Sequence, residues 1–264
     1  MSANVKPVPE RVIFGFHTVL ARLRADPKSV LEVFLDESRK DARAKDFAAT
    51  VQSSGARLMR VPAARLDGMA GGGRHQGVAA RVEVNTQKQT LEELLESLAT
   101  PPLLLVLDGI TDPHNLGACL RVANAAGANA VVAPKDHAAG INATVSKVAS
   151  GAAEITPYFM VTNLARTLAD LKDRNIWIVG SDERAEKTIF EADIPKSVAW
   201  VLGAEGAGMR RLTRESCDLL VRIPMRGQVE SLNASVAAGI CLFESVRRAA
   251  PNPSGIHSSG SSRS

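Results

Sequence analysis

The chain has 264 residues, of which 45% are hydrophobic and 23% are charged, and its formal net charge is +4. These values are typical of globular proteins and exclude wholesale disorder, and the length exceeds that of one typical domain. No apolar run approaches the ~18–20 residues that a membrane-spanning helix needs, so we expect no membrane partner.

Charge and cysteine placement narrow the class of protein further. Residues 1–80 carry 13 Lys and Arg against 8 Asp and Glu, whereas the remaining residues carry 19 against 20. A basic first third is typical of a surface that faces nucleic acid, and it is equally compatible with a solvated basic face. Cys119, Cys217 and Cys241 are odd in number and widely spaced, which argues against disulfides and a structural zinc site. We therefore expect a cytoplasmic protein.

Residues 1–81 predict a small, basic α/β domain that binds RNA. Its helices are expected at 18–26, 40–54 and 63–69, and its strands at 29–35, at 56–61 and from Val78 onward. Thr18 or a neighbouring residue is a candidate N-cap for the first helix. Residues 82–101 are predicted to be a linker, because a polar run and a short amphipathic helix end there at Pro101 and Pro102.

From residue 102 to 250 the pattern becomes one of strands alternating with helices. Strands are predicted at 103–109, 130–134, 156–161, 176–181, 198–203 and 219–224, and helices at 115–126, 142–153, 163–174, 209–216 and 233–249. Near-continuous apolar strands alternating with helices indicate a parallel sheet covered on both faces. The last helix carries an apolar stripe, typical of a core or a dimer interface, made of Val236, Ile240, Phe243 and Val246. Residues 251–264 are predicted to be a disordered tail.

Three loops at predicted strand ends hold candidate functional side chains, and in open parallel sheets ligands bind at those ends. In the first loop, Asn115 lies where a helix is expected to begin and Arg121 follows on the same apolar helix. An N-cap role for Asn115 and a surface role for Arg121 are the alternatives. A lone arginine on so apolar a helix favours a functional role.

The second and third loops are individually ambiguous. LGAEGAG at 202–208 ends a strand and lets a ligand approach the backbone, although tight-turn geometry explains the glycines equally well. The carboxylate of Glu205 disfavours a phosphate ligand there. In the third loop, Ser231 and Asn233 stand at the start of the last helix, where capping alone would account for them.

Taken in order, the loops resemble the three motifs of the SpoU (TrmH-type) family of RNA ribose 2′-O-methyltransferases, which belong to the SPOUT superfamily. The matching stretches are NLGACLR at 115–121, LGAEGAG at 202–208 and the segment 223–235, which ends in SLNAS. FGFHTVLARL at 14–23 and HQGVAA at 75–80 resemble the family's substrate-binding domain more weakly. One departure is Ala234, where the family often has valine, and this buried size change leaves the catalytic residues in place.

The resemblance implies a fold, a cofactor and an assembly. The fold would be a C-terminal parallel-sheet SPOUT domain with a deep trefoil knot, preceded by a small ribosomal-protein-like α/β domain. S-adenosylmethionine would be bound, largely through the backbone, by Gly203, Ile223 and Leu232. The protein would be a homodimer, for which the C-terminal helix is our candidate interface.

The resemblance also implies methylation of the ribose 2′-oxygen of a guanosine in 23S ribosomal RNA. Arg121 would either act as a perturbed base or hold the 3′-phosphate and stabilise the developing alkoxide; we favour the second role, because arginine is normally a permanent cation. Asn115, Ser231 and Asn233 would orient the ribose. Glu205 would organise Arg121 or Asn115, or accept the proton. No side chains have metal-ligand spacing, so we predict no metal.

Three alternatives remain open. One is a ribose methyltransferase that acts on tRNA or on another rRNA site. Another is a non-catalytic RNA-binding or ribosome-assembly protein of the same fold, which would be expected to lose residues such as Arg121. The last is a nucleotide-binding α/β enzyme that uses the glycine-rich loop, against which Glu205 and the lack of a following lysine argue.

Overall fold

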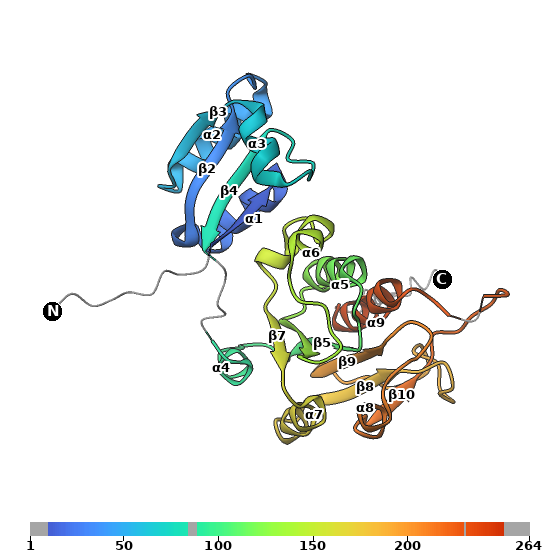
Figure 1. The fold of residues 1–264 in the computed structure, drawn as a ribbon. Coiled ribbons are helices and arrows are strands. Elements are labelled where there is room, and N and C mark those ends of the chain that lie inside the picture. Colours follow the sequence, from blue (N-terminus) through green and yellow to red (C-terminus); the bar gives the residue numbers. More distant parts are fainter. Residues whose placement is uncertain (1–9, 84–88, 230, 251–264) are drawn as a thin grey trace, which may run out of the picture.

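The computed structural model describes residues 10–83, 89–229 and 231–250. Figure 1 shows that these residues form two sheets, each with its own helices, one from the N-terminal part and one from the C-terminal part. The predicted tail at 251–264 and part of the predicted linker lie outside the described residues. No helix in the described ranges has the length and apolar character required to cross a membrane.

The N-terminal sheet has four strands in the order β1-β4-β2-β3. Strand β4 is antiparallel to both β1 and β2, whereas β3 is parallel to β2. The strands are β1 (Glu10–Phe14), β2 (Val30–Asp36), β3 (Leu58–Val61) and β4 (Val78–Glu83). The helices are α1 (Phe16–Ala25), η1 (Pro27–Ser29), α2 (Ala42–Ser53) and α3 (Ala63–Ala70). The three predicted helices and three predicted strands of this part are all present.

The start of this part differs from the prediction in two respects. Strand β1 was not predicted, because ERVIF lacks alternation and its partner, β4, lies more than sixty residues away. Helix α1 begins at Phe16 and is preceded by Gly15, whose φ of 91° turns the chain from strand to helix. The predicted N-cap at Thr18 is therefore wrong, and Thr18 is buried inside the helix because Phe16 anchors the helix start in the core.

The C-terminal sheet has six strands, all parallel, in the order β10-β8-β9-β5-β6-β7. Its strands are β5 (Leu103–Asp108), β6 (Ala130–Pro134), β7 (Tyr158–Val161), β8 (Trp177–Ser181), β9 (Val198–Gly203) and β10 (Leu219–Val221). Its helices are α4 (Leu91–Glu96), α5 (Pro113–Ala125), α6 (Ala143–Val148), η2 (Ala152–Glu154), α7 (Leu164–Asp173), α8 (Arg211–Glu215) and α9 (Ala234–Ala249).

Two apolar layers cover this sheet, as predicted. One layer packs α5, α6 and α9 against the first face, and the other packs α4 and α7 against the opposite face. Figure 1 shows α5, α6 and α9 together on one side of the strands and α7 and α8 on the other. The predicted parallel α/β sheet is confirmed, whereas the trefoil knot implied by the resemblance stays a prediction.

Two helices of this part differ from expectation. Helix α6 was predicted to continue to residue 153 but ends at Val148, because Ser150 and Gly151 adopt positive φ values of 52° and 94° and a separate turn, η2, follows. The stripe on α9 is divided between the core and the surface. Ile240 packs against the core, whereas Val236 is 49% exposed and Phe243 is 47% exposed, so the interface interpretation of the exposed members stays a prediction.

Candidate functional site

The three motif loops follow neighbouring strands of the parallel sheet. Strand β9 pairs with β5 on one side and with β8 on the other, and β10 extends the sheet beyond β8. Because parallel strands end at the same edge, the segments after β5, β9 and β10 begin at one edge of the sheet. Side-chain contacts between these segments decide which predicted residues meet.

Asn115 and Asn233 are brought together. The side-chain amide of Asn233 donates a hydrogen bond of 2.8 Å to Oδ1 of Asn115, across 118 positions of sequence. Asn115 is the third residue of α5, and the N-cap of that helix is Asp112, which accepts hydrogen bonds from the backbone N–H of His114 and Asn115. The N-cap alternative for Asn115 is therefore wrong, and its side chain is left to meet the third motif.

Asn233 has a second task in the same place. Its Oδ1 accepts hydrogen bonds from the backbone N–H of Ser235 at 2.9 Å and from the Ser235 hydroxyl at 2.7 Å, which caps α9. The capping interpretation of Asn233 is thus confirmed, but it accounts only for the oxygen of the amide. The nitrogen of the same amide fixes the start of α9 to the start of α5.

The other three polar candidates are exposed. Arg121 lies on α5, Glu205 at the tip of the glycine-rich loop and Ser231 just before α9. Within the ranges that the structure describes, none of their side chains forms a hydrogen bond or an ion pair. The structure therefore does not join Glu205 to Arg121 or to Asn115. An exposed guanidinium without a carboxylate partner remains available to an anionic ligand.

The glycine-rich loop is closed by its own backbone. Ala204 and Gly208 exchange two N–H to C=O hydrogen bonds of 3.1 and 2.8 Å, so that residues 205–207 form the tip. Gly203 cannot carry a side chain, because a Cβ there would overlap the backbone of Gly208 and Met209. The glycine at 203 is thus explained by the tight turn of the loop itself, and approach of a ligand to this backbone stays a prediction.

A buried carboxylate that sequence reasoning missed holds this loop on the sheet. Asp108, at the end of β5, has a fully buried side chain and accepts hydrogen bonds from the backbone N–H of Arg210 at 2.8 Å and from its Nε at 2.6 Å. The signal was present, because an aspartate that ends a wholly apolar strand is unusual. The ion pair ties the segment after β9 to the strand that precedes α5.

The segment between β10 and α9 fits a ligand that is read through the backbone. Among the described residues, no backbone hydrogen bond involves residues 223–229 or 231–232. Ile223 is half-buried against the core below the segment, and Leu232 is also half-buried. The exposed backbone N–H and C=O groups of this segment can pair with water or with a bound ligand, and they would require such a partner when covered.

Neither thiol chemistry nor a metal centre is indicated by the described residues. Burial raises the pKa of Cys119, Cys217 and Cys241 to about 12, so none is a thiolate near neutral pH. All three cysteines are free. No group of three or more His, Cys, Asp or Glu residues that could hold a metal ion occurs in the parts of the chain that the structure describes.

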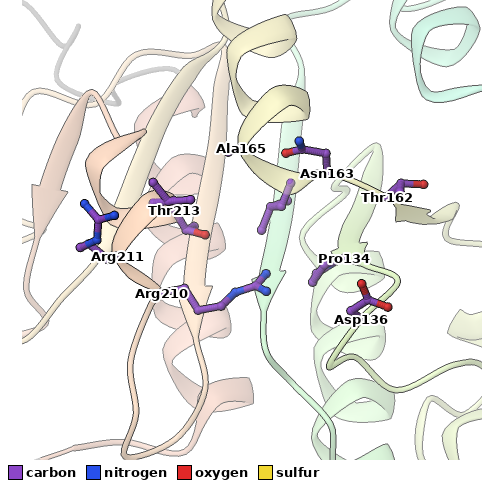
Figure 2. Close-up of a pocket in the computed structure, with 10 residues that line it drawn as sticks. Pro134, Asp136, Thr162, Asn163, Ala165, Arg210, Arg211 and Thr213 are labelled. Atoms are coloured by element: carbon purple, nitrogen blue, oxygen red, sulfur yellow. The ribbon is translucent and has the colours of Figure 1, made fainter.

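A cleft of about 300 Å³ lies at the carboxyl ends of β6 and β7, beside the start of α8. Figure 2 shows that the Arg210 side chain extends into the space toward Pro134 and Asp136. None of the predicted catalytic or cofactor-binding residues lines this cleft. Arg210 therefore connects the cleft to the end of β5 through its ion pair with Asp108.

Comparison with known proteins covers both parts of the chain. A family model described as the SpoU rRNA Methylase family matches residues 102–243, and one described as RNA 2'-O ribose methyltransferase substrate binding matches residues 12–87. A protein of Ralstonia nicotianae named 23S rRNA (guanosine-2'-O-)-methyltransferase RlmB is 56% identical over 238 residues. This alignment covers 90% of the chain and 96% of that protein.

Solved structures agree with these matches. A crystal structure of an RNA 2'-O ribose methyltransferase has a TM-score of 0.75 at 27% identity and covers 91% of this chain and 89% of that chain. The SpoU methyltransferase AviRb from Streptomyces viridochromogenes, solved in complex with AdoMet, has a TM-score of 0.73 at 24% identity and covers 90% of each chain. The second likeness concerns the fold alone.

Proposed function

The chain belongs to the SpoU rRNA methylase family, and on that premise we propose that it methylates the ribose 2′-oxygen of a guanosine in 23S ribosomal RNA, with S-adenosylmethionine as methyl donor. The similarity that supports the substrate extends over 90% of the chain and is not confined to the catalytic motifs. The substrate-binding match at 12–87 supports an RNA ligand in the same way.

One structural observation carries the assignment to these residues. The 2.8 Å hydrogen bond between Asn233 and Asn115 joins the third motif to the first across the sheet edge. Amide side chains that are fixed in this way can orient a sugar hydroxyl and its phosphate by hydrogen bonds. A purely structural cap at Asn233 would not require a partner on a second helix.

The proposed cofactor site is formed by Gly203, Ile223 and Leu232. Its support is the segment between β10 and α9, whose backbone has no hydrogen-bond partner among the described residues. When bound, S-adenosylmethionine supplies a methyl group that its positively charged sulfur activates. The protein's task is then to exclude water, to position the ribose and to manage the proton of the 2′-hydroxyl.

Arg121 and Glu205 are the residues that we assign to charge stabilisation and proton transfer at the 2′-oxygen. An exposed arginine with no ion pair among the described side chains is a permanent cation, which suits binding of the 3′-phosphate and stabilisation of the developing negative charge. No contact in the described ranges supports an organising role for Glu205 toward Arg121 or Asn115. The proposal therefore assigns Glu205 the acceptance of the proton. Ser231 adds a hydroxyl that orients the ribose.

The proposal includes a division of labour along the chain. Residues 1–81 bind RNA, residues 82–101 connect the two parts, and residues 102–250 hold the methyltransferase site. The separate core of the N-terminal sheet supports this division. The proposal also includes a homodimer in the cytoplasm. The exposed stripe of Val236, Phe243 and Val246 supports the dimer, because such apolar patches mark interaction sites.

The test is methyl transfer from labelled S-adenosylmethionine to protein-free 23S rRNA that lacks its natural modifications, with the product nucleoside identified. We expect 2′-O-methylguanosine at a single position. Transfer to tRNA in a parallel reaction, with none to 23S rRNA, would overturn the substrate but retain the chemistry. Cofactor binding without transfer to protein-free 23S rRNA, to tRNA or to ribosomal precursor particles would overturn the proposed activity.

A further inference from the structure

A buried charge cluster lies between the two sheets of the molecule. Nη2 of Arg11, on β1, donates to both carboxylate oxygens of Glu154, on η2, at 2.6 and 2.7 Å. Nη1 of Arg11 donates to the hydroxyl of Ser146, on α6, at 3.1 Å. Nη1 of Arg22, on α1, lies 3.5 Å from the same carboxylate. Two guanidiniums of the N-terminal part therefore converge on one carboxylate of the C-terminal part.

Arg22 is held rigidly by its own side of this boundary. Its Nε donates to the hydroxyl of Ser29 at 2.7 Å, and its Nη2 donates to the carbonyl oxygen of Glu83 at 3.2 Å. The side chain of Arg22 is 1% exposed and that of Glu154 is fully buried. Charges buried to this degree are costly without an opposite partner, and each side of the boundary supplies the partner of the other.

The backbones also approach closely at this boundary. Gly151 has a φ of 94°, and a Cβ there would lie 2.8 Å from the Cβ of Ala21 and 3.2 Å from the carbonyl oxygen of His17. Only glycine fits both the conformation and the space. Figure 1 shows the N-terminal sheet with α1 lying over the α6 end of the C-terminal sheet. The two parts are therefore packed together at a defined position.

This boundary is one packing layer away from the proposed catalytic residues. Both α6 and η2 pack against α5, the helix that carries Asn115 and Arg121. The contact is close, because a Cβ at Gly117 of α5 would lie 2.7 Å from the Cβ of Val148 at the end of α6. A rigid connection thus runs from the N-terminal sheet through Glu154 to α5.

We propose that Glu154 is a positioning residue that docks the N-terminal RNA-binding domain onto η2 and α6, so that bound RNA is presented to Asn115 and Arg121. This inference rests on the proposed function for the identity of the substrate. Docking fixes the distance between the surface that holds the RNA and the residues that act on the ribose. Loss of the carboxylate charge would free the two parts while leaving each core intact.

The test uses the full chain with one dye on each part. Lys45 on α2 and Lys196 before β9 are exposed, and each is replaced by cysteine for labelling. The native cysteines stay thiols, because burial raises their pKa to about 12. The variants are Glu154→Gln, which removes the charge and preserves the shape, and Arg11→Met. The matched control is Arg57→Met, which removes an ion pair with Glu32 inside the N-terminal sheet.

We expect Glu154→Gln and Arg11→Met to broaden and lower the energy transfer between the dyes, whereas Arg57→Met leaves it unchanged. RNA methylation, as kcat/KM for RNA, should fall by about 10- to 100-fold, because displaced substrates react slowly. The Kd for S-adenosylmethionine should stay within about two-fold, because η2 does not form the cofactor site. The double variant with Glu154→Gln and Arg11→Met should lose no more energy transfer and no more kcat/KM than either single variant, because both substitutions break the same ion pair.

Each other outcome is informative. Unchanged energy transfer in both variants, with unchanged thermal unfolding, would overturn the docking. Lowered energy transfer with unchanged RNA methylation would overturn the positioning role. A loss of cofactor binding in parallel would indicate unfolding of the catalytic part and also contradict the role. If the wild-type chain methylates no RNA, the proposed function fails, and the dye measurement still decides whether Glu154 docks the two parts.

Discussion

Asp108 at the end of β5 accepts hydrogen bonds from both the backbone and the side chain of Arg210, just before α8. The carboxylate is fully buried, whereas the guanidinium is 47% exposed and reaches the cleft shown in Figure 2. The pair therefore fixes the segment that follows the glycine-rich loop to the strand that leads into α5. Strands β5 and β9 already pair along their length, and this carboxylate adds a side-chain link between the segments that follow them.

The first prediction concerns this pair. Asp108→Asn should destabilise the protein by about 1–3 kcal/mol, because one acceptor and the buried opposite charge are lost while Arg210 can turn to solvent. The Kd for S-adenosylmethionine should rise by about ten-fold, because the loop at Gly203 is no longer fixed. Chemical denaturation and calorimetric titration measure the two effects.

Arg211→Met is the matched control for Asp108→Asn. Arg211 follows Arg210 directly, but its ion pair with Glu215 is exposed. Exposed pairs of this kind contribute between about 0 and 1 kcal/mol, so stability and cofactor affinity should be nearly unchanged. Equal cofactor affinity in Asp108→Asn and in the wild type would show that the ion pair does not position the loop.

The second prediction separates the two tasks of Asn233. Asn233→Asp keeps the oxygen that caps α9 but replaces the amide nitrogen that donates to Asn115. Stability should stay within about 0.5 kcal/mol, because aspartate caps as well as asparagine. Methyl transfer should fall by about ten-fold or more, because Asn115 loses its orientation. Asn233→Ala should lose both properties, with about 1 kcal/mol of stability lost with the cap.

Thermal unfolding and kcat for methyl transfer check this separation. Full activity in Asn233→Asp would restrict Asn233 to the structural role that its position at a helix start suggests. A parallel loss of stability and activity in that variant would mean that the 2.8 Å hydrogen bond is structural rather than a means of orienting the substrate.

The C-terminal fold was predictable because its strands are long apolar runs with helices between them. Strand β5 is buried along nearly its whole length, and such a strand can be recognised without its neighbours. Strand β1 could not be predicted in this way, because ERVIF becomes a strand only through pairing with β4. The break after α6 depends on Ser150 in a left-handed conformation. Serine seldom adopts this conformation, so the residue types in this stretch do not predict the break.

Candidate site residues could be selected from the sequence, but the contacts between them could not. Asn115 and Asn233 stand out in the sequence because they lie near expected helix starts after strands, yet their hydrogen bond joins residues 118 positions apart. Asp108 was missed although an aspartate at the end of an apolar strand is unusual, because its partner, Arg210, lies 102 positions away. Glu154 was missed because its two arginines lie far away in the sequence, Arg11 on β1 and Arg22 on α1. Long-range pairing of charges cannot be derived from local pattern.

The third prediction concerns Arg121. Arg121→Ala should lower kcat for methyl transfer by about 10²–10³-fold, which is the usual effect of removing one stabiliser of a developing oxyanion. The Kd for S-adenosylmethionine should stay within a few-fold, and thermal unfolding should be unchanged because the side chain is exposed. Arg121→Lys should recover only part of the rate, because lysine lacks the planar fork that binds a phosphate.

Arg166→Ala is the control for the loss of a positive charge. Arg166 is exposed on α7, which covers the opposite face of the sheet from α5. The Arg166→Ala variant should therefore have the same kcat for methyl transfer as the wild type. If Arg121→Ala weakened cofactor binding as much as catalysis, Arg121 would belong to the cofactor site rather than to the 2′-oxygen.

The fourth prediction concerns the stripe on α9. Phe243 is 47% exposed in the single chain, and a partner copy that covers it would bury an aromatic side chain of the kind that dominates interfaces. Phe243→Asp should raise the dimer Kd by about 30-fold or more, because the lost contact is worth about 2 kcal/mol and a charge is buried without a partner. Sedimentation of wild type and variant over a range of concentrations measures this change.

The control for the dimer prediction is Phe190→Asp, the same substitution at a phenylalanine that is 58% exposed outside the stripe. Phe190→Asp should leave the dimer Kd unchanged. This result would show that an added surface charge by itself does not weaken the dimer. Arg121, Glu205 and Ser231 have no side-chain partners in the described part of one chain, and a second copy close to α5 and α9 could complete their surroundings. Methyl transfer by Phe243→Asp should therefore fall at low protein concentration and recover at high concentration. A fully active monomer would place the whole site within one chain.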